Sequence, residues 1–280
     1  MSKNEITWSN GQWNSTSAPL IGATDHAFWM ATTVFDGARS IQGHTPDLDL
    51  HCERLNRSAL TLGMEPVMTP QQTVDLVREG LKKLSHTTDY YIKLLYFAPG
   101  GFLLPDPATT QLAIHIFESP LPADSGFSAT FSEFLRPDPS MAPTDAKASC
   151  LYPNTQRILR DASARGFDNA IVLDSKGKVA EFAVANLWIV RDGVALTPAL
   201  NGTFLNGITR QRVMQLLRDD GIEVREASLA PQDILDADEV FSTGNNGKVL
   251  HCNRIDDRHY AHGPIETRAH ELYMAYTKRN

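Results

Sequence analysis

The feature that most restricts the fold of this chain is a series of short apolar segments that leads into a helix. Residues 170–173, 186–190 and 194–196 are rich in branched apolar side chains, which favours β-strands. Residues 210–220 then carry apolar side chains at helical spacing before a terminating glycine. Short strands that lead into a helix predict a mixed α/β (α+β) protein.

Regular structure is predicted along the rest of the chain as well. Strands are expected at 5–8, 12–14, 31–35, 90–97, 111–117, 127–135 and 239–242, and helices at 48–64, 70–84, 155–165 and 265–276. Asn10-Gly11 favours a hairpin turn between the first two strands. Thr69 and Gln72 form a capping box around a proline at the first helical position. A glycine bulge is expected at Gly37.

A segment rich in proline and small residues, 119–126, divides the chain into two predicted domains. Residues 1–118 are expected to form a small N-terminal domain, and residues 127–280 a larger C-terminal one. With 280 residues, the chain is long enough to bury a large core as one domain or as two.

Charge and composition exclude some classes of partner. The formal net charge of −7 disfavours nucleic acid and anionic membrane surfaces. No apolar run approaches the roughly 20 residues of a membrane span, and residues 1–5 lack the apolar core of a signal peptide. The three cysteines are widely spaced, which predicts buried free thiols and a cytoplasmic location. The nine histidines show no metal-ligand spacing, so no metal site is expected.

Lys147 is the candidate catalytic residue. It stands among small and apolar residues, and Tyr152 and Glu181 follow it along the chain. A lysine nucleophile must lose its proton, which a desolvated environment favours. Taken alone, such a lysine is more often a surface charge, and a tyrosine or glutamate here has an ordinary structural alternative. Together with a turn at Gly207 that opens a helix, these residues are the parts needed to hold a phosphorylated pyridine aldehyde.

The same region resembles the class IV (fold-type IV) pyridoxal-phosphate aminotransferases, the family of the branched-chain and D-amino-acid aminotransferases. The family signature is matched at Glu181, Asn186, Thr197, Pro198, Leu205, Gly207, Ile208, Thr209 and Arg210. With Lys147 upstream the pattern is specific, and the resemblance covers nearly the whole chain. Trp188 replaces the usual Phe or Tyr, and Ala195 replaces a larger apolar residue. Both are expected to be packing positions.

The resemblance implies pyridoxal 5′-phosphate as the cofactor and gives roles to several residues. Lys147 would bind the cofactor aldehyde covalently and then carry a proton between substrate and cofactor. Glu181 would keep the pyridine nitrogen protonated. Tyr152 would hydrogen-bond the oxygen on the ring, and Leu205 belongs to the same cofactor-binding set.

Three segments are expected to bind the phosphate. Arg54 stands in the family's His-x-x-Arg pattern, and a guanidinium fits a phosphate bidentately. Ile208 and Thr209 would offer backbone N–H groups at a helix start, where Thr209 is also a candidate N-cap. Asn245 would make a further contact, although Asn245 and Asn246 replace the Thr-Ala pair of many relatives.

The expected substrate pocket departs from that of the branched-chain enzymes. Met30 stands where they carry a tyrosine, and Lys93 where they carry the arginine that binds the substrate carboxylate. Lysine keeps the charge but lacks the fork of the guanidinium. Phe35 and Asn246 complete the predicted substrate-binding residues.

The resemblance therefore implies a two-domain enzyme with a small α/β sandwich domain, a larger β-barrel-like domain with flanking helices, and the cofactor between them. It also implies a homodimer. The expected reaction is ping-pong transfer of an amino group between an apolar, branched-chain-type amino acid and a 2-oxo acid such as 2-oxoglutarate.

Other functions remain open on the same scaffold. They are a D-amino-acid or (R)-selective amine transaminase, an aminodeoxychorismate lyase, and a binding protein without enzyme activity. The presence of Arg54, Lys147 and Glu181 together argues against the last of these.

Overall fold

The computed structural model describes residues 4–15, 19–85, 87–123 and 125–278. Residues 1–3 and residue 124 of the predicted linker therefore lie outside the described residues. The chain divides into unit 1, residues 1–121, 145–151 and 277–280, and unit 2, residues 122–144 and 152–276.

The segment that carries Lys147 belongs to unit 1, whereas the sequence assigns it to the C-terminal domain. Its backbone explains this difference. The Phe35 N–H donates to the Lys147 carbonyl at 3.0 Å, and Ala148 forms an isolated bridge with Val34. Residues 145–151 thus lie against the last strand at one edge of the unit 1 sheet.

In the described part of unit 1, five strands form an antiparallel sheet in the order β2-β1-β5-β4-β3. Their bounds are β1 Glu5–Ser9, β2 Gln12–Asn14, β3 Thr33–Ser40, β4 Tyr90–Phe97 and β5 Gln111–Glu118. The predicted hairpin turn is confirmed, because Asn10 and Gly11 both have positive φ, 52° and 79°. Positive φ at both central residues is what a type I′ turn requires.

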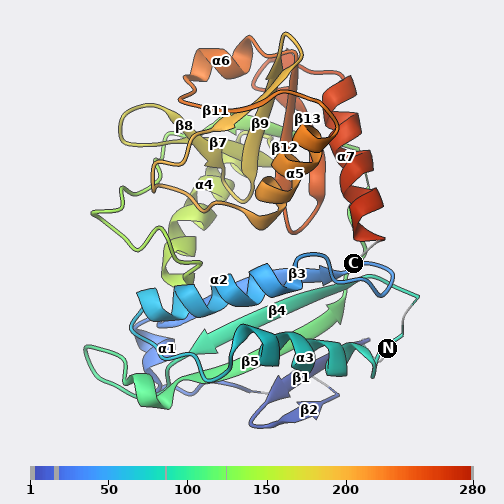
Figure 1. The fold of residues 1–280 in the computed structure, drawn as a ribbon. Coiled ribbons are helices and arrows are strands. Elements are labelled where there is room, and N and C mark those ends of the chain that lie inside the picture. Colours follow the sequence, from blue (N-terminus) through green and yellow to red (C-terminus); the bar gives the residue numbers. More distant parts are fainter. Residues whose placement is uncertain (1–3, 16–18, 86, 124, 279–280) are drawn as a thin grey trace. The chain divides into compact units, whose positions relative to one another are not determined.

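Two helices, α2 (Leu48–Thr61) and α3 (Pro70–Leu81), cover one face of this sheet (Figure 1). Their apolar side chains, such as Leu55 and Val77, pack with strand residues such as Ile92. The predicted capping box of α3 is confirmed by hydrogen bonds in both directions between Thr69 and Gln72. The shorter elements are α1 (His26–Trp29) and the 3₁₀ turn η1 (Pro107–Thr109).

The bulge predicted at Gly37 is wrong. Strand β3 continues through this residue, which pairs directly with Lys93 of β4, and the ladder runs unbroken from Thr33 to Ser40. Pairing along the whole strand outweighs the local flexibility of one glycine. Paired residues of neighbouring strands point to the same face, so Gly37 and Lys93 are neighbours on that face.

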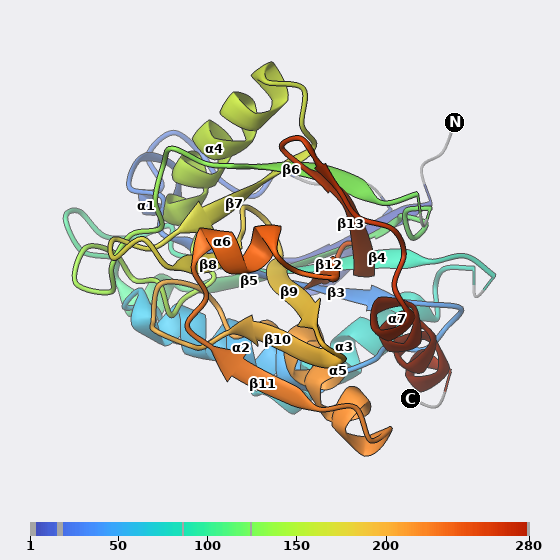
Figure 2. The same ribbon diagram turned by 90° about the horizontal axis from the view of Figure 1, so that it is seen from above.

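In the described part of unit 2, nine strands form a second sheet, in the order β11-β10-β9-β12-β13-β6-β7-β8, with β14 paired to β13. Their bounds are β6 Phe127–Phe131, β7 Asn169–Leu173, β8 Val179–Phe182, β9 Asn186–Arg191, β10 Val194–Pro198, β11 Val224–Ala227, β12 Glu239–Gly244, β13 Lys248–Ile255 and β14 Arg258–His259. The sheet curls until β8 contacts β9 and β10 (Figure 2). The predicted barrel-like body is confirmed.

Helices pack against this curled sheet. They are α4 Tyr152–Ala164, α5 Ile208–Asp219, α6 Pro231–Leu235 and α7 Pro264–Thr277, and the 3₁₀ turn η2 (Ser149–Leu151) precedes α4. Side chains of α5 and α7 form one apolar cluster with Trp188 and Ala195, both of which are buried. Trp188 also stacks on Phe241 at 5.5 Å between ring centroids. The prediction that these two departures from the family pattern are packing positions is confirmed.

The cysteines differ in their environments. Cys52 and Cys252 are buried, as predicted, and burial raises the pKa of each thiol to about 12. Cys150 is exposed, which contradicts the prediction, because it lies in the η2 turn, whose residues are not buried. Within the described ranges, no helix combines the length and the apolar composition that a membrane crossing needs.

Candidate active site

Lys147 is held by its own backbone against the edge of the unit 1 sheet. Its N–H donates to the hydroxyl of the buried Ser58 at 3.0 Å, and its carbonyl accepts from Phe35 at 3.0 Å. The ammonium nitrogen lies 4.9 Å from the centroid of the Phe35 ring, a distance at which the ring face attracts a cation. The predicted catalytic lysine and the predicted substrate residue Phe35 are thus in contact.

Arg54 is oriented by a buried carboxylate. Its Nε and Nη2 donate to the two oxygens of Asp36 at 2.7 and 2.9 Å, and His51 Nδ1 lies 2.7 Å from the same carboxylate. Burial by itself would raise the pKa of Asp36, but the charges of Arg54 and His51 hold it well below its usual value. Asp36 therefore remains ionised and fixes the plane of the guanidinium.

The remaining predicted substrate residues of unit 1 have different surroundings. Lys93 lies on the same face of the sheet as Phe35. It pairs with Gly37 in the β3–β4 ladder, and Gly37 is two residues after Phe35, so both positions point to one face. Its ammonium nitrogen is 5.9 Å from the centroid of the Phe117 ring. Met30 follows α1 and is 40% exposed.

Glu181 of unit 2 is held from two sides. Its Oε1 lies 3.0 Å from Arg136 Nη2, and its Oε2 accepts from the Asn186 amide at 3.1 Å. Arg136 is itself fixed, because it donates to the carbonyl of Ala183 at 2.6 Å. The sequence singles out Glu181 and Asn186 but misses Arg136, which stands in no motif and comes from a distant part of the chain.

At the start of α5, the backbone of Gly207 lies close to the side chain of Asn186. Gly207 is the N-cap, and a Cβ on it would lie 2.0 Å from Asn186 Oδ1, so only glycine fits. Asn186 also donates to the Leu205 carbonyl at 3.0 Å. The N-cap predicted at Thr209 is wrong, because the close approach of Gly207 starts the helix earlier, with Ile208 as its first residue.

Arg210, the last residue of the signature, has a structural role. It is 1% exposed, and its guanidinium donates to Glu226 at 2.6 Å, to Asn206 at 2.8 Å and to the Pro198 carbonyl at 3.0 Å. These bonds tie the loop before α5 to strand β10. They hold the backbone of Ile208 and Thr209 in place.

The turn between β12 and β13 carries Asn245 and Asn246. Lys248 is 2% exposed, adopts a positive φ of 61°, and donates to Asn245 Oδ1 at 2.8 Å. Asn246 lines a cavity of about 180 Å³ in unit 2 together with Ser242 and Gly244. The sequence misses Lys248, whose only signal is its place directly after an Asn-Asn-Gly turn.

Tyr152 is the first residue of α4 and is half-buried. It follows directly on the segment that carries Lys147, and it belongs to unit 2. The structure thus places Arg54, Lys147, Phe35, Lys93 and Met30 in unit 1, and the other predicted site residues in unit 2.

Residues 33–255 match the family described as Amino-transferase class IV. A probable branched-chain-amino-acid aminotransferase of Aquifex aeolicus is 31% identical over 91% of this chain and 86% of its own length. The branched-chain-amino-acid aminotransferase of Escherichia coli is 27% identical over 97% of this chain and 93% of its own.

Solved structures are similar over nearly the whole chain. An aminotransferase from Brucella abortus bound to the cofactor PLP has a TM-score of 0.96 and 44% identity, with 98% of this chain and 99% of that one covered. A branched-chain aminotransferase from Thermoproteus uzoniensis with norvaline has a TM-score of 0.90 and 29% identity, with coverages of 98% and 95%.

Proposed function

Because the chain belongs to the class IV aminotransferases, we propose that it moves an amino group between an apolar, branched-chain-type amino acid and a 2-oxo acid such as 2-oxoglutarate. The predicted family, fold type and activity class are confirmed: the chain is a pyridoxal-phosphate-dependent transaminase. The contact of the Lys147 amine with Phe35 is the observation that carries the proposed site. The names of the relatives support the substrate class.

The residues of each unit fit the parts of pyridoxal phosphate. Gly207 cannot supply a side-chain cap, and N–H groups at a helix start attract a phosphate. The guanidinium of Arg54 is fixed by Asp36, and the carboxylate of Glu181 is fixed by Arg136. We therefore assign the phosphate to Arg54, Ile208, Thr209 and Asn245, the ring to Tyr152, Glu181 and Leu205, and the aldehyde to Lys147.

When bound, pyridoxal phosphate supplies an aldehyde that bonds to amines and a ring that accepts electron density. The Lys147 amine would take the proton from Cα of the substrate and deliver it to the aldehyde carbon of the cofactor. Glu181 would hold a proton at the ring nitrogen, and Asn186 and Arg136 keep its carboxylate in position.

The substrate is assigned to Met30, Phe35, Lys93 and Asn246. Lys93 would attract the substrate carboxylate, because it lies on the same face of the sheet as Phe35. If Lys93 binds this carboxylate, Lys93→Met raises KM for amino acids and leaves KM for simple amines unchanged. An equal KM for amino acids in the variant would exclude this role.

We also propose a homodimer. Unit 1 exposes a cluster of apolar side chains around Trp29 and Phe102, whose rings lie 5.8 Å apart, and Leu103 and Leu104 are 70% and 79% exposed. Apolar side chains gathered in this way mark an interaction surface, and a second copy of this chain would cover them.

We propose the cytoplasm as the location of the protein. The free thiols of Cys52, Cys150 and Cys252 support a reducing compartment of this kind.

The experiment that tests the substrate class is the visible absorbance of the purified protein. It is recorded before and after addition of L-leucine, D-alanine and (R)-1-phenylethylamine. A yellow cofactor band that L-leucine alone bleaches supports the branched-chain assignment. Bleaching by D-alanine or the (R)-amine instead would make the chain a D-amino-acid or (R)-amine transaminase. No band after addition of pyridoxal phosphate would contradict the cofactor site itself.

A further inference from the structure

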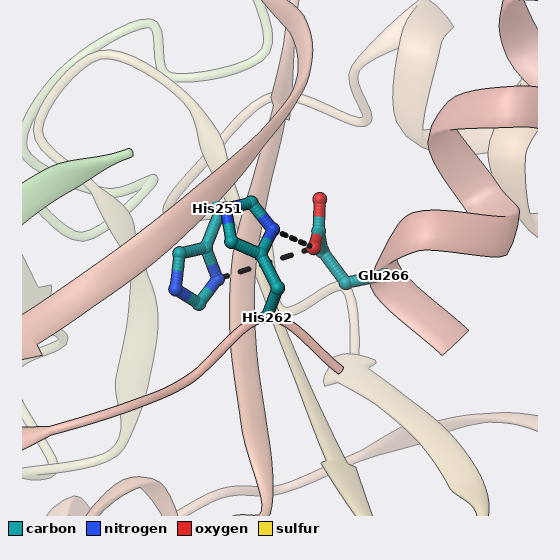
Figure 3. A group of neighbouring side chains, drawn as sticks. All are labelled: His251, His262 and Glu266. Carbon is teal, nitrogen blue, oxygen red and sulfur yellow. Dashed lines mark hydrogen bonds and ion pairs between the residues drawn. The ribbon is translucent and has the colours of Figure 1, made fainter. Parts of the chain in front are cut away.

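Three side chains of unit 2 converge on one point, and none of them belongs to the proposed cofactor site (Figure 3). His251 lies on β13, His262 in the loop before α7, and Glu266 in the first turn of α7. One ligand atom from each lies within 4.8 Å of the other two. His262 Nδ1 is 3.0 Å and His251 Nδ1 is 4.0 Å from the same oxygen, Glu266 Oε2.

The tautomer of His251 is set by its other nitrogen. His251 Nε2 lies 3.1 Å from the Tyr260 carbonyl, which can only accept, so Nε2 carries a proton. A neutral His251 ring then presents the lone pair of Nδ1 toward Glu266. A histidine that binds a metal through one nitrogen commonly donates the other to a backbone carbonyl in this way.

A divalent cation would compensate the buried carboxylate. The side chains of His251 and Glu266 are 2% and 1% exposed, so a charge on Glu266 is screened little by water. The rings of His251 and His262 stack with centroids 4.1 Å apart and planes at 26°, so both can bind one ion only after one ring turns. The ring of His262 has room to turn, because its side chain is 48% exposed.

The backbone holds the three residues in place by other means. The buried carboxylate of Glu239 accepts the N–H groups of Ile265 and Glu266 at 3.2 and 2.7 Å and so fixes the start of α7. A Cβ at Gly263 would lie 1.9 Å from Glu239 Cδ, so glycine is required between His262 and the helix. The backbone that carries His262 and Glu266 is therefore fixed by the fold.

We propose that His251, His262 and Glu266 form a binding site for a divalent transition-metal cation, with Zn²⁺ as the best fit. Zn–N bonds of about 2.0–2.1 Å in a tetrahedron place neighbouring ligand atoms about 3.3 Å apart. Two of the three separations, 3.0 and 4.0 Å, bracket this value, and all three are within 4.8 Å, so a turn of the His262 ring would complete the set of ligands. Imidazole nitrogens also suit zinc better than they suit magnesium or calcium.

The ion fastens the first turn of α7 to strand β13, and water supplies the fourth ligand from the side of His262, which is 48% exposed. The sequence gives no sign of this site, because the histidines belong to separate elements and only the hairpin of β13 and β14 brings them together. The role is structural and separate from transamination.

The test uses the holoenzyme after removal of metal with a chelator. Zn²⁺ binding is measured by titration calorimetry, and the unfolding temperature is measured with and without Zn²⁺. The variants are His262→Gln, whose side chain is half-exposed and tolerates the change, and His259→Gln, an exposed histidine of the same hairpin, as the matched control. All proteins are compared at equal cofactor content, because the cofactor phosphate also binds cations.

We expect the unchanged protein and His259→Gln to bind one Zn²⁺ per chain and to unfold at a higher temperature with it. His262→Gln is expected to bind at least about 100-fold more weakly and to lose this shift. Equal Zn²⁺ affinity in the unchanged protein and His262→Gln, or the absence of binding to either, would overturn the proposal.

Discussion

In each unit an ion pair holds one functional side chain of the proposed site, and the charges of the two pairs are reversed. In unit 1 a carboxylate is the support and an arginine the functional group: Asp36 fixes Arg54. In unit 2 an arginine is the support and a carboxylate the functional group: Arg136 fixes Glu181. The side chain of Asp36 is fully buried, whereas that of Glu181 is 13% exposed.

This difference in burial predicts that mutations in the two networks have different effects, on folding stability in one and on the reaction rate in the other. Removal of a buried charge leaves its partners uncompensated in a medium of low dielectric, which costs folding free energy. Removal of a partner from a group that keeps some contact with solvent, as Glu181 does, mainly frees that group to move, which impairs its positioning. We therefore expect damage to the Asp36 network to appear first in unfolding measurements, and damage to the Glu181 network in kinetics.

The largest effect is expected from Lys147→Ala, which removes the reactive amine and touches neither network. Turnover should fall by at least about 10⁴-fold, roughly 5.5 kcal/mol of barrier. The unfolding temperature should change little, because the bonds to Ser58 and Phe35 are made by the backbone. Steady-state transamination and thermal unfolding check both statements. Lys176→Ala, at an exposed lysine, is the control, and normal turnover of Lys147→Ala would refute the assignment.

Asp36→Asn is expected to have the next largest effect, on stability. Loss of the buried charge leaves Arg54 and His51 without their counter-charge and should lower the free energy of unfolding by about 3–5 kcal/mol. Urea unfolding measures this loss, with Asp49→Asn, at an exposed carboxylate of α2, as the control. A loss no larger than that of the control would contradict the role given to Asp36.

The pH dependence sharpens the same test. The pKa of Asp36 is lowered in the folded protein, so its contribution to stability is complete above the unfolded value of about 3.9. The contribution is lost as the pH falls through the lower folded value. The stability difference between the unchanged protein and Asp36→Asn should therefore shrink as the pH falls below about pH 4.

Glu181→Gln tests the other network and should affect rate rather than stability. We expect kcat to fall about 100- to 1000-fold, roughly 3–4 kcal/mol, because a neutral amide no longer favours the protonated ring nitrogen. Exchange of the substrate α-proton with solvent deuterium follows the affected step directly. Glu133→Gln, at an exposed glutamate, is the control, and an unchanged exchange rate would show the assignment to be wrong.

The smallest effect is expected from Arg136→Met. Because Arg136 acts through Glu181, kcat should fall only about 10-fold, or about 1.4 kcal/mol. A double-mutant cycle with Glu181→Gln identifies this indirect role, since Arg136→Met should have almost no further effect on kcat in that background. Fully additive effects would mean that Arg136 acts on the reaction by another route.

Features carried by a few neighbouring residues could be predicted from the sequence. The Asn10-Gly11 turn, the capping box of Thr69 and Gln72, and most strands and helices depend on interactions within one segment. The family and the cofactor followed from a signature in which each residue type has its own chemistry. Strand β13 was missed, because polar residues such as His251 and Asn253 interrupt its apolar pattern.

Features that join distant segments were decided only by the tertiary structure. Arg136 reaches Glu181 because β6, β7 and β8 are neighbours in one curled sheet, and the strand through Gly37 is stabilised by its full ladder with β4. The return of Lys147 to unit 1 and the meeting of His251 with Glu266 arise in the same way. The sequence by itself determined which chemical groups this protein has, because side-chain chemistry is local. Packing and strand pairing decided which groups hold one another, because those contacts depend on the whole fold.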